Sequence, residues 1–448
     1  MNKNQELLEK ASFPKLLLNL SLPAVVIMLV MIVYNMADTY FIGQTGSPAK
    51  IAAISLCGPM FSILSGLGTL FGSGGCTAIS LALGKKETET VKRYSSFCCC
   101  AALVLGAVFL VVANLFLSPI SDLMGADAET RADAMAYLRI IALGAPFIMF
   151  NNVFANVIRA DGAARASMIA NCLGTLSNIA LDALFILGFS WDVAGAAVAT
   201  VLGNCISCVY LLYYIRRKQP ILSLSPRELT LKPEVSWTVV SLGLPMACST
   251  LLMSLSHIVA NRMVIGYGSV ALAAQGVSGK IGMVITMLAM GICMGLQPAI
   301  SYNFGAGNLK RMKQVIRSTA VFTVCLGSAL TIACYLARNA IIAAFIDNAE
   351  VIAYGQVFVF ASIIIGPFYG LYQLCQTFLQ STGKASYATA VALMDKGLFY
   401  LPLLFLLGRA FGLYGIIFTG AVTLFLSLAA GLVFSFLWNR KINAPVAD

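Results

Sequence analysis

The sequence predicts an all-α polytopic membrane protein with twelve transmembrane helices arranged as two pseudo-symmetric six-helix lobes. Of its 448 residues, 59% are hydrophobic and only 10% are charged, whereas soluble domains carry about 25% charged residues. Twelve apolar runs are each long enough to cross a bilayer as a helix. The chain also repeats itself after about 221 residues, as from Gly84 to Gly305. These three observations together predict the fold class.

The apolar runs define the predicted spans in order along the chain. Each run contains about 20 or more mostly apolar residues, the length that a helix needs to cross the hydrocarbon core. We expect the spans at residues 16–42, 50–83, 92–118, 132–158, 166–189, 193–215, 236–266, 270–301, 315–338, 351–380, 386–408 and 411–438.

Basic residues predict the orientation of the spans. One set of loops, together with both ends of the chain, carries twenty-one Lys and Arg residues, and the opposite set carries only Lys50, Arg131, Arg338 and Arg409. Basic loops remain on the cytoplasmic side. We therefore expect both termini in the cytoplasm and the protein as a monomer in the lipid bilayer of a bacterial inner membrane. The net charge of +11 follows from this topology and needs no nucleic-acid partner.

The internal repeat predicts the domain organisation. Leu22-Pro23 recurs as Leu244-Pro245, and Pro146-Phe147 recurs as Pro367-Phe368. Each copy holds six spans, so both copies begin on the same side of the membrane. We expect an N-lobe at 1–215, a cytoplasmic linker at 216–235 and a C-lobe at 236–448. Transporters built from such parallel repeats hold their substrate between the halves and move them for alternating access.

Two acidic residues lie within apolar spans of the first half. Asp38 and Asp182 would each cost about 2.5–3.5 kcal/mol near the centre of a membrane helix, so each is a candidate functional residue. Counting 1.5 Å per residue from the outer loops places both at the depth of Thr200, with Asn178 one turn from Asp182. Such an oxygen-rich cluster suits Na+ or protons. The alternative is a hydrogen-bonded cluster that only fixes helix packing.

Other side chains suggest a substrate and limit the chemistry. Thirteen scattered cysteines and one histidine, His257, predict no metal site beyond Na+ and no cofactor. Aromatic and methionine side chains near the predicted interface of the halves would suit amphipathic drugs and organic cations, although ordinary helix packing would use the same residues. These candidates are Tyr34, Phe147, Met149, Phe150, Met283, Met287, Phe368 and Tyr369.

Several short motifs resemble those of a known family. Leu22-Pro23, the Tyr34–Gly43 segment, Leu83-Gly84-Lys85 and Arg159-Ala160-Asp161-Gly162 occur in this order, followed by Asn178 and Asp182. In order and spacing the chain resembles the multidrug and toxic compound extrusion (MATE) family, in its bacterial MepA-like and DinF-like branch. The resemblance covers essentially all twelve spans.

The resemblance implies a cation-coupled antiporter that exports drugs and toxic organic cations, with H+ or Na+ as the coupling ion. It assigns coupling to the N-lobe residues Asp38, Asn178, Asp182 and Thr200, with Asn152 and Asn156 nearby. Neither Asp38 nor Asp182 is matched by an acidic residue at the aligned position of the second half. One alternative is a lipid-linked oligosaccharide flippase of the same superfamily, which would need a strongly basic cavity. A membrane acyltransferase is the other, and it would need a catalytic histidine with an acidic partner.

Overall fold

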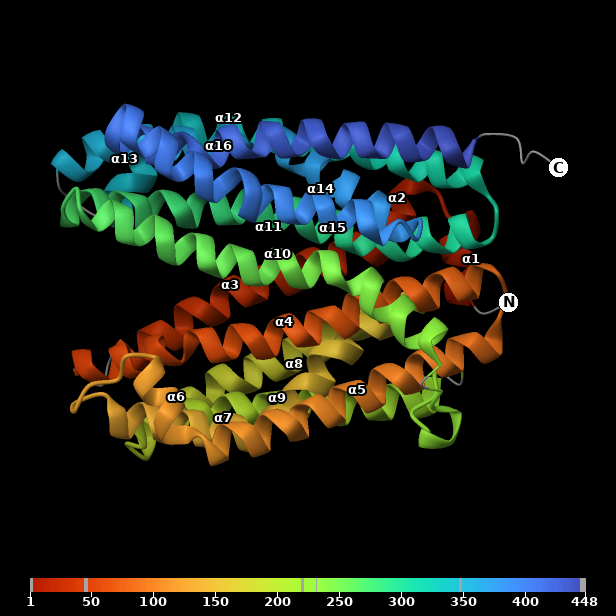
Figure 1. The fold of residues 1–448 in the computed structure, drawn as a ribbon, viewed down its shortest axis with the longest axis horizontal. Coiled ribbons are helices and arrows are strands. Elements are labelled where there is room, and N and C mark those ends of the chain that lie inside the picture. Colours follow the sequence, from red (N-terminus) through yellow and green to blue (C-terminus); the bar gives the residue numbers. More distant parts are fainter. Residues whose placement is uncertain (1–2, 44–46, 219–220, 231, 346–348, 444–448) are drawn as a thin grey trace. The chain divides into compact units, whose positions relative to one another are not determined.

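The computed structural model describes residues 3–43, 47–218, 221–230, 232–345 and 349–443 of the chain. Within these residues the backbone forms helices and no strand (Figure 1). A helix satisfies its own backbone hydrogen bonds, which is what a segment surrounded by lipid requires. The predicted all-α class is confirmed.

Eleven helical stretches among the described residues are long and apolar enough to cross a membrane. The last of them, Ala385–Ile442, has 58 residues, about twice the length that one crossing needs. It is broken at Gly412, where φ is 60° and ψ is −136°, a conformation open mainly to glycine. This stretch therefore contains the predicted eleventh and twelfth spans, and the twelve-span prediction is confirmed.

The first six spans begin after a short helix, α1 (Lys3–Lys10). The first span consists of α2, the π-helical η1 and α3, and a short helix, α6, separates the third and fourth spans. The bounds are α2 (Phe13–Leu16), η1 (Leu17–Ser21), α3 (Leu22–Gly43), α4 (Pro48–Gly84), α5 (Thr88–Leu115), α6 (Leu117–Leu123), α7 (Arg131–Val157), η2 (Ile158–Asp161), α8 (Ala164–Asp182), η3 (Ala183–Gly188) and α9 (Asp192–Lys218).

The remaining spans follow a loop that contains one 3-10 turn, η4 (Pro226–Glu228). The tenth span is divided between α13 and α14, and the eleventh contains a π-helical segment, η5. The bounds are α10 (Pro233–Ile265), α11 (Ser269–Gly305), α12 (Leu309–Phe345), α13 (Ala349–Ile363), α14 (Gly366–Ser381), α15 (Ala385–Leu393), η5 (Met394–Phe399) and α16 (Tyr400–Ile442).

The repeat is visible in backbone conformation as well as in sequence. Gly162 follows the fourth span with a φ of 79°, and its repeat partner Gly383 follows the tenth span with a φ of 78°. A left-handed residue directly after a helix closes its last turn, and glycine adopts that conformation without strain. The fourth span of the first copy and the corresponding tenth span of the second copy therefore both end at a left-handed glycine.

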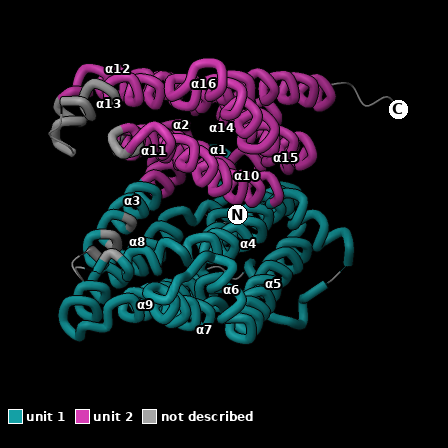
Figure 2. The backbone as a smooth tube through the Cα atoms, turned by 60° about the vertical axis from the view of Figure 1, so that its left-hand side comes forward, with its two compact units in different colours: residues 1–10, 26–243 teal, residues 11–25, 244–448 magenta. Residues whose placement is uncertain are grey.

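The chain divides into two compact units, one of residues 1–10 and 26–243 and the other of residues 11–25 and 244–448 (Figure 2). Residues 11–25 belong to the second unit, where the Ser21 hydroxyl donates to the Ile292 carbonyl at 3.2 Å. Gly295 lies against the backbone of Leu20 and Ser21 without room for a side chain. The predicted N-lobe at 1–215 includes residues 11–25, which the structure groups with the second unit. The predicted domain ranges stay a prediction.

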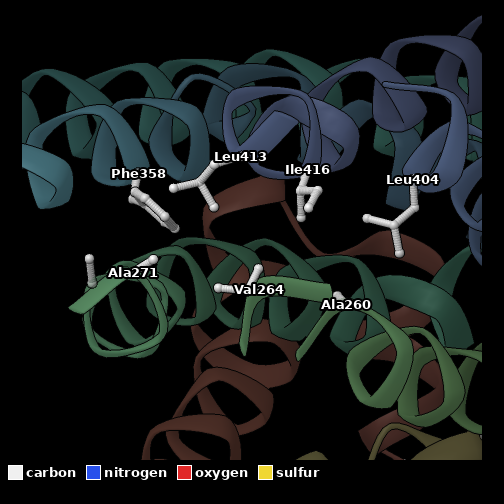
Figure 3. Packing of buried hydrophobic residues seen from close by; sticks show 8 residues of the cluster. Ala260, Val264, Ala271, Phe358, Leu404, Leu413 and Ile416 are labelled. Carbon is white, nitrogen blue, oxygen red and sulfur yellow. The ribbon is translucent and has the colours of Figure 1, made fainter. Parts of the chain in front are cut away.

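Each unit has its own apolar core. In the second unit, buried side chains from four helices meet in one cluster (Figure 3). Ala260 and Val264 of α10 face Leu404 and Ile416 of α16 there, with Phe358 of α13 beside them. In the first unit, Phe154 is fully buried and Phe150 stacks on it at 4.5 Å between ring centroids. Phe150 and Phe154 belong to α7, which also carries a polar residue of the site described next.

Candidate functional site

Two helices of the first unit carry polar side chains at helical spacing. On α8, Asn171, Thr175, Asn178 and Asp182 recur every three or four residues, so they share one face. On α9, Thr200, Asn204 and Ser207 do the same. The two helices pack against each other within the unit. A polar stripe on each helix therefore meets the other in an otherwise apolar bundle.

Glycines let the backbones of α8 and α9 approach closely. A Cβ atom added to Gly203 would lie 2.6 Å from the carbonyl oxygen of Gly174 and 3.0 Å from the Asn178 Cβ. A Cβ atom added to Gly174 would lie 2.1 Å from the Ser207 Oγ. Small residues at helix crossings are typical of membrane proteins, where close packing replaces the hydrophobic driving force.

The polar stripes line a cavity of about 100 Å³. Tyr34 of α3, Phe61 of α4 and Asn151 of α7 complete its wall, so the cavity lies among five helices of one unit. The remaining lining residues all belong to α8 and α9: Asn171, Gly174, Thr175, Asn178, Thr200, Gly203, Asn204 and Ser207. Most of these side chains are neutral hydrogen-bonding groups.

Hydrogen bonds connect the cavity residues. Asn178 Nδ2 donates to Thr200 Oγ1 at 3.3 Å, and Asn151 Nδ2 donates to Asn204 Oδ1 at 2.9 Å. Asn204 Nδ2 donates in turn to the Thr200 carbonyl at 2.8 Å. Within the described part of the chain, the Oδ1 atoms of Asn151 and Asn178 are buried and accept no hydrogen bond. Amide oxygens of this kind are ligands that hard cations prefer.

Asp182 is fully buried beside this network, at 0% exposure. It ends α8, one helical turn after Asn178, and the π-helical η3 begins at the next residue. A π-helical turn inside a helix is uncommon and often occurs at functional sites. The structure therefore places a buried carboxyl group one turn from the amide of the cavity wall.

The structure brings together only part of the predicted coupling cluster. Asn178 and Thr200 are in contact, and Asp182 is adjacent to them in α8. Asn156 instead accepts a hydrogen bond from Arg159 at 2.5 Å, and Asn152 packs where Gly68 leaves room, so neither lines this cavity. The side chain of Asp38, in α3, lies outside the described residues. The coupling assignments stay predictions.

The predicted substrate residues lie in varied surroundings. Tyr34 lines the polar cavity, Met149 and Phe150 are buried in the first unit, and Phe147 is 49% exposed. In the second unit, Phe368 packs edge-to-face on Phe425, and Tyr369 lies 5.9 Å from Tyr372 between ring centroids. Met283 and Met287 are partly buried in α11. Their roles in binding substrate stay predictions.

Sequence reasoning missed five polar residues of the cavity, of which Thr175 lies between Asn171 and Asn178 on α8. Asn171 and Asn204 continue the helical spacing from Asn178 and Thr200, and Ser207 extends it by another turn. That periodicity is a signal from which they could have been found. Asn151 has no such signal, because its position depends on how α7 is rotated against α9.

The second unit holds its buried acid differently. Asp395 lies 3.1 Å from the Lys396 ammonium and accepts a hydrogen bond from Ser427 at 3.2 Å. Asp395 is the second residue of η5, so a π-helical segment occurs beside a buried acid in this unit too. The tenth span carries buried glutamines, of which Gln376 donates to Ser249 at 3.2 Å.

Residues 23–184 and again residues 245–406 match the MatE family model. The chain belongs to the MatE family. Its sequence is 30% identical over 440 residues to the multidrug export protein MepA of Staphylococcus saprophyticus, covering 98% of this chain and 97% of that protein. MepA of Staphylococcus aureus strain NCTC 8325 is 30% identical over 448 residues, with the same coverage. The two matched segments of this MatE protein also correspond to its two sequence repeats.

Solved structures share the MatE fold. An outward-facing multidrug resistance MATE transporter of the MOP superfamily superposes with a TM-score of 0.92 at 21% identity, covering 99% of both chains. A MATE structure in the bent conformation gives a TM-score of 0.91 at 21% identity, covering 99% of this chain and 98% of that one. The protein is a membrane transporter of the MATE family and not an enzyme.

Proposed function

We propose that this MATE transporter exports amphipathic, often cationic, drugs and toxins in exchange for H+ or Na+ by alternating access of two lobes. The MepA relatives are named multidrug export proteins, and this supports drug export over the flippase alternative. Cation coupling is supported chiefly by one observation: a fully buried carboxyl group, Asp182, lies one turn from the polar cavity.

The cavity residues fit a small hard cation. The buried Oδ1 atoms of Asn151 and Asn178 and the Thr200 hydroxyl offer neutral oxygen ligands, and the Asp182 carboxylate would supply the negative charge. The same carboxylate could instead take up a proton, which would neutralise its charge inside the apolar bundle. In both cases, binding of the ion removes the cost of a charge held in an apolar bundle.

Asp38 is the second proposed coupling residue. It follows Tyr34 by four residues in α3, and this spacing places the two positions on one face of a helix. Tyr34 lines the cavity. We propose that Asp38 and Asp182 together bind the coupling ion, H+ or Na+, with Asn178 and Thr200 as neutral ligands.

Export from everted membrane vesicles tests the coupling. We expect Asp182→Asn and Asp38→Asn to abolish export of a fluorescent cation such as ethidium while the protein level in the membrane stays unchanged. The matched control is Asp192→Asn, an acid at the start of α9 that is partly exposed. Export by Asp182→Asn at the wild-type rate would refute the role of this carboxylate.

A second measurement separates the two ions. Export is followed with and without an imposed pH gradient, in each case with Na+ present or replaced by choline. Dependence on Na+ identifies Na+ as the coupling ion, and indifference to Na+ with dependence on the pH gradient identifies H+. If export depends on neither gradient, the proposed antiport is wrong.

The membrane orientation is part of the same proposal. Both termini are proposed to be cytoplasmic, with the monomeric protein in a bacterial inner membrane. Fusion of green fluorescent protein or alkaline phosphatase after residue 448 tests this. We expect fluorescence without phosphatase activity, as for a cytoplasmic C-terminus. Phosphatase activity without fluorescence would contradict the proposed orientation.

A further inference from the structure

A second cavity, of about 360 Å³, lies among α12, α14 and α16 of the second unit. Its walls are mainly apolar and include Leu374 and Phe378 of α14 and Leu432 and Phe436 of α16. Leu432 and Phe436 are exposed large hydrophobic residues. The groove is therefore open along an apolar surface, which in a membrane protein faces lipid chains.

Two basic side chains line one end of this groove. Lys313 and Arg317 are one turn apart on α12, and both are exposed. Lys313 Nζ donates to Asn443 Oδ1 at 2.6 Å, and in the part of the chain that the structure describes Arg317 forms no ion pair. No acidic residue lines the groove. The groove therefore carries a net positive charge beside mainly apolar walls.

The internal repeat provides a built-in comparison. The offset from Gly84 to Gly305 aligns Lys92 of α5 with Lys313, and Ser96 with Arg317. In the first unit Ser96 Oγ donates to the Ser225 carbonyl at 2.7 Å. The linker therefore binds α5 at the position where the second unit carries Arg317.

The rest of this linker contact has no equivalent in the second unit either. Ser95 Oγ donates to the Ser223 carbonyl at 3.0 Å and accepts from the Ser223 amide at 2.8 Å. The residue aligned with Ser95 is Ile316, which cannot form these bonds. Six of the eight residues that line the corresponding space in the first unit belong to the linker at 216–235.

The charges differ in the same sense. In the first unit Lys92 pairs with Glu89 at 3.0 Å, and Glu228 lines the neighbouring space. In the second unit the aligned Lys313 has only the neutral Asn443 as its described hydrogen-bond partner. In the first unit, the linker covers the surface of α5 around Lys92, and acidic residues offset its charge. In the second unit, the corresponding surface of α12 stays open, apolar and positively charged.

Aromatic anchors mark the level of the groove in the membrane. Trp438 of α16 donates its indole N–H to Thr382 Oγ1 at 2.9 Å, and Lys384 Nζ lies 5.1 Å from the centre of its ring. Tryptophan and lysine in such contact are typical of the boundary between lipid chains and headgroups. The adjacent residue, Asn439, lines the groove. The basic end of the groove therefore lies at headgroup depth.

We propose that this groove binds one anionic glycerophospholipid of the cytoplasmic leaflet. Its phosphate lies between Arg317 and Lys313, and one acyl chain lies along Leu374, Phe378 and Leu432. Basic pockets between transmembrane helices on the cytoplasmic side bind anionic headgroups. Charge complementarity selects an anionic lipid, and the apolar walls select a lipid over a free phosphate ion.

The test compares two lipids on the purified full-length protein after extensive detergent exchange. Phosphatidylglycerol and phosphatidylcholine with identical acyl chains are added, and bound lipid is counted by native mass spectrometry while the melting midpoint is followed. We expect wild type to prefer phosphatidylglycerol by about tenfold. Equal retention of the two lipids would overturn the proposal, and so would retention of inorganic phosphate in place of lipid.

Matched variants locate the site. Lys313→Gln/Arg317→Gln should abolish the preference, and Arg317→Lys should retain most of it. Leu432→Trp, which fills the groove and keeps both charges, should also lose bound lipid. The control Lys310→Gln removes a basic residue of α12 that does not line the groove, and its preference should equal that of wild type. A loss with Lys310→Gln as large as with the double variant would show a diffuse charge effect and refute a defined site.

Two further outcomes decide against the proposal. Deleting residues 444–448 should leave the lipid preference unchanged, and a gain in bound lipid would identify the end of the chain as the natural occupant. Wild-type lipid preference in the Leu432→Trp variant would place the bound lipid elsewhere. Each variant is compared only as a monodisperse species with the wild-type circular dichroism spectrum, so a folding failure is recognised.

Discussion

Substitution of Gly203 by alanine tests whether the close crossing of α8 and α9 holds the polar cavity together. The new Cβ atom would lie 2.6 Å from the carbonyl oxygen of Gly174, whereas ordinary contacts of this kind begin near 3.4 Å. The obstacle is backbone, so no side chain can rotate away. The two helices would have to separate by several tenths of an ångström or more.

The cost of this separation can be bounded. Overpacking of a well-packed core costs about 1–3 kcal/mol, and replacing a helical glycine by alanine recovers up to about 1 kcal/mol. We therefore expect Gly203→Ala to lower the free energy of unfolding by about 1–2 kcal/mol. The Asn178–Thr200 hydrogen bond is already 3.3 Å long, so separation of the helices should break it and reduce coupled export as well.

Gly58→Ala is the matched control. Gly58 lies in α4 of the same unit, and a Cβ atom added there would meet nothing within 4 Å. Only the helix-propensity gain remains, so its melting midpoint should equal or exceed that of wild type. Thermal unfolding in one detergent and export from everted vesicles are measured for both variants. If Gly203→Ala melts and transports like Gly58→Ala, the glycine crossing does not hold the site.

Three further predictions concern charges. Lys396→Gln leaves the buried Asp395 without its ion pair, and we expect a loss of about 1–2 kcal/mol in thermal unfolding that a second substitution, Asp395→Asn, largely restores. The Lys50–Asp192 pair at 2.6 Å is partly exposed, so a double-mutant cycle should give a coupling below about 1 kcal/mol that falls further in high salt. Hydrogen bonds from the Thr130 hydroxyl and amide lower the pKa of Asp127. The ionised Asp127 therefore stabilises its turn fully at pH values above the ordinary aspartate pKa, and this contribution is lost as the pH falls through the lowered pKa of Asp127. Asp127→Asn should remove the part of the acid dependence of the melting midpoint that comes from this residue.

Helix positions were predictable because they depend on local properties of the sequence. The expected span 132–158 corresponds to α7 at Arg131–Val157, and the expected span 193–215 corresponds to α9 at Asp192–Lys218. Apolar length and the charged residues at each end determine such bounds. No knowledge of neighbouring helices is needed for them.

Features that depend on neighbouring helices were not predictable. The π-helical turn after Asp182 has no signature in the apolar pattern. The assignment of residues 11–25 to the second unit depends on contacts such as Ser21 with the Ile292 carbonyl, across 271 positions of sequence. Likewise, Asn151 reaches Asn204 only through the rotation of α7. Sequence periodicity gives the face of a helix, but not the partner that the face meets.

The differences between the two copies are where the repeat is most informative. Both copies retain the residues that shape the backbone, such as Gly162 and Gly383 with nearly equal φ angles. They differ in how charge is held inside the bundle: Asp182 lies by an amide-lined cavity, whereas Asp395 pairs with its own neighbour Lys396. An acid with a permanent cationic partner has little need of a mobile ion, because the ammonium already offsets its charge. This argues against Asp395 as the residue that binds a coupling ion.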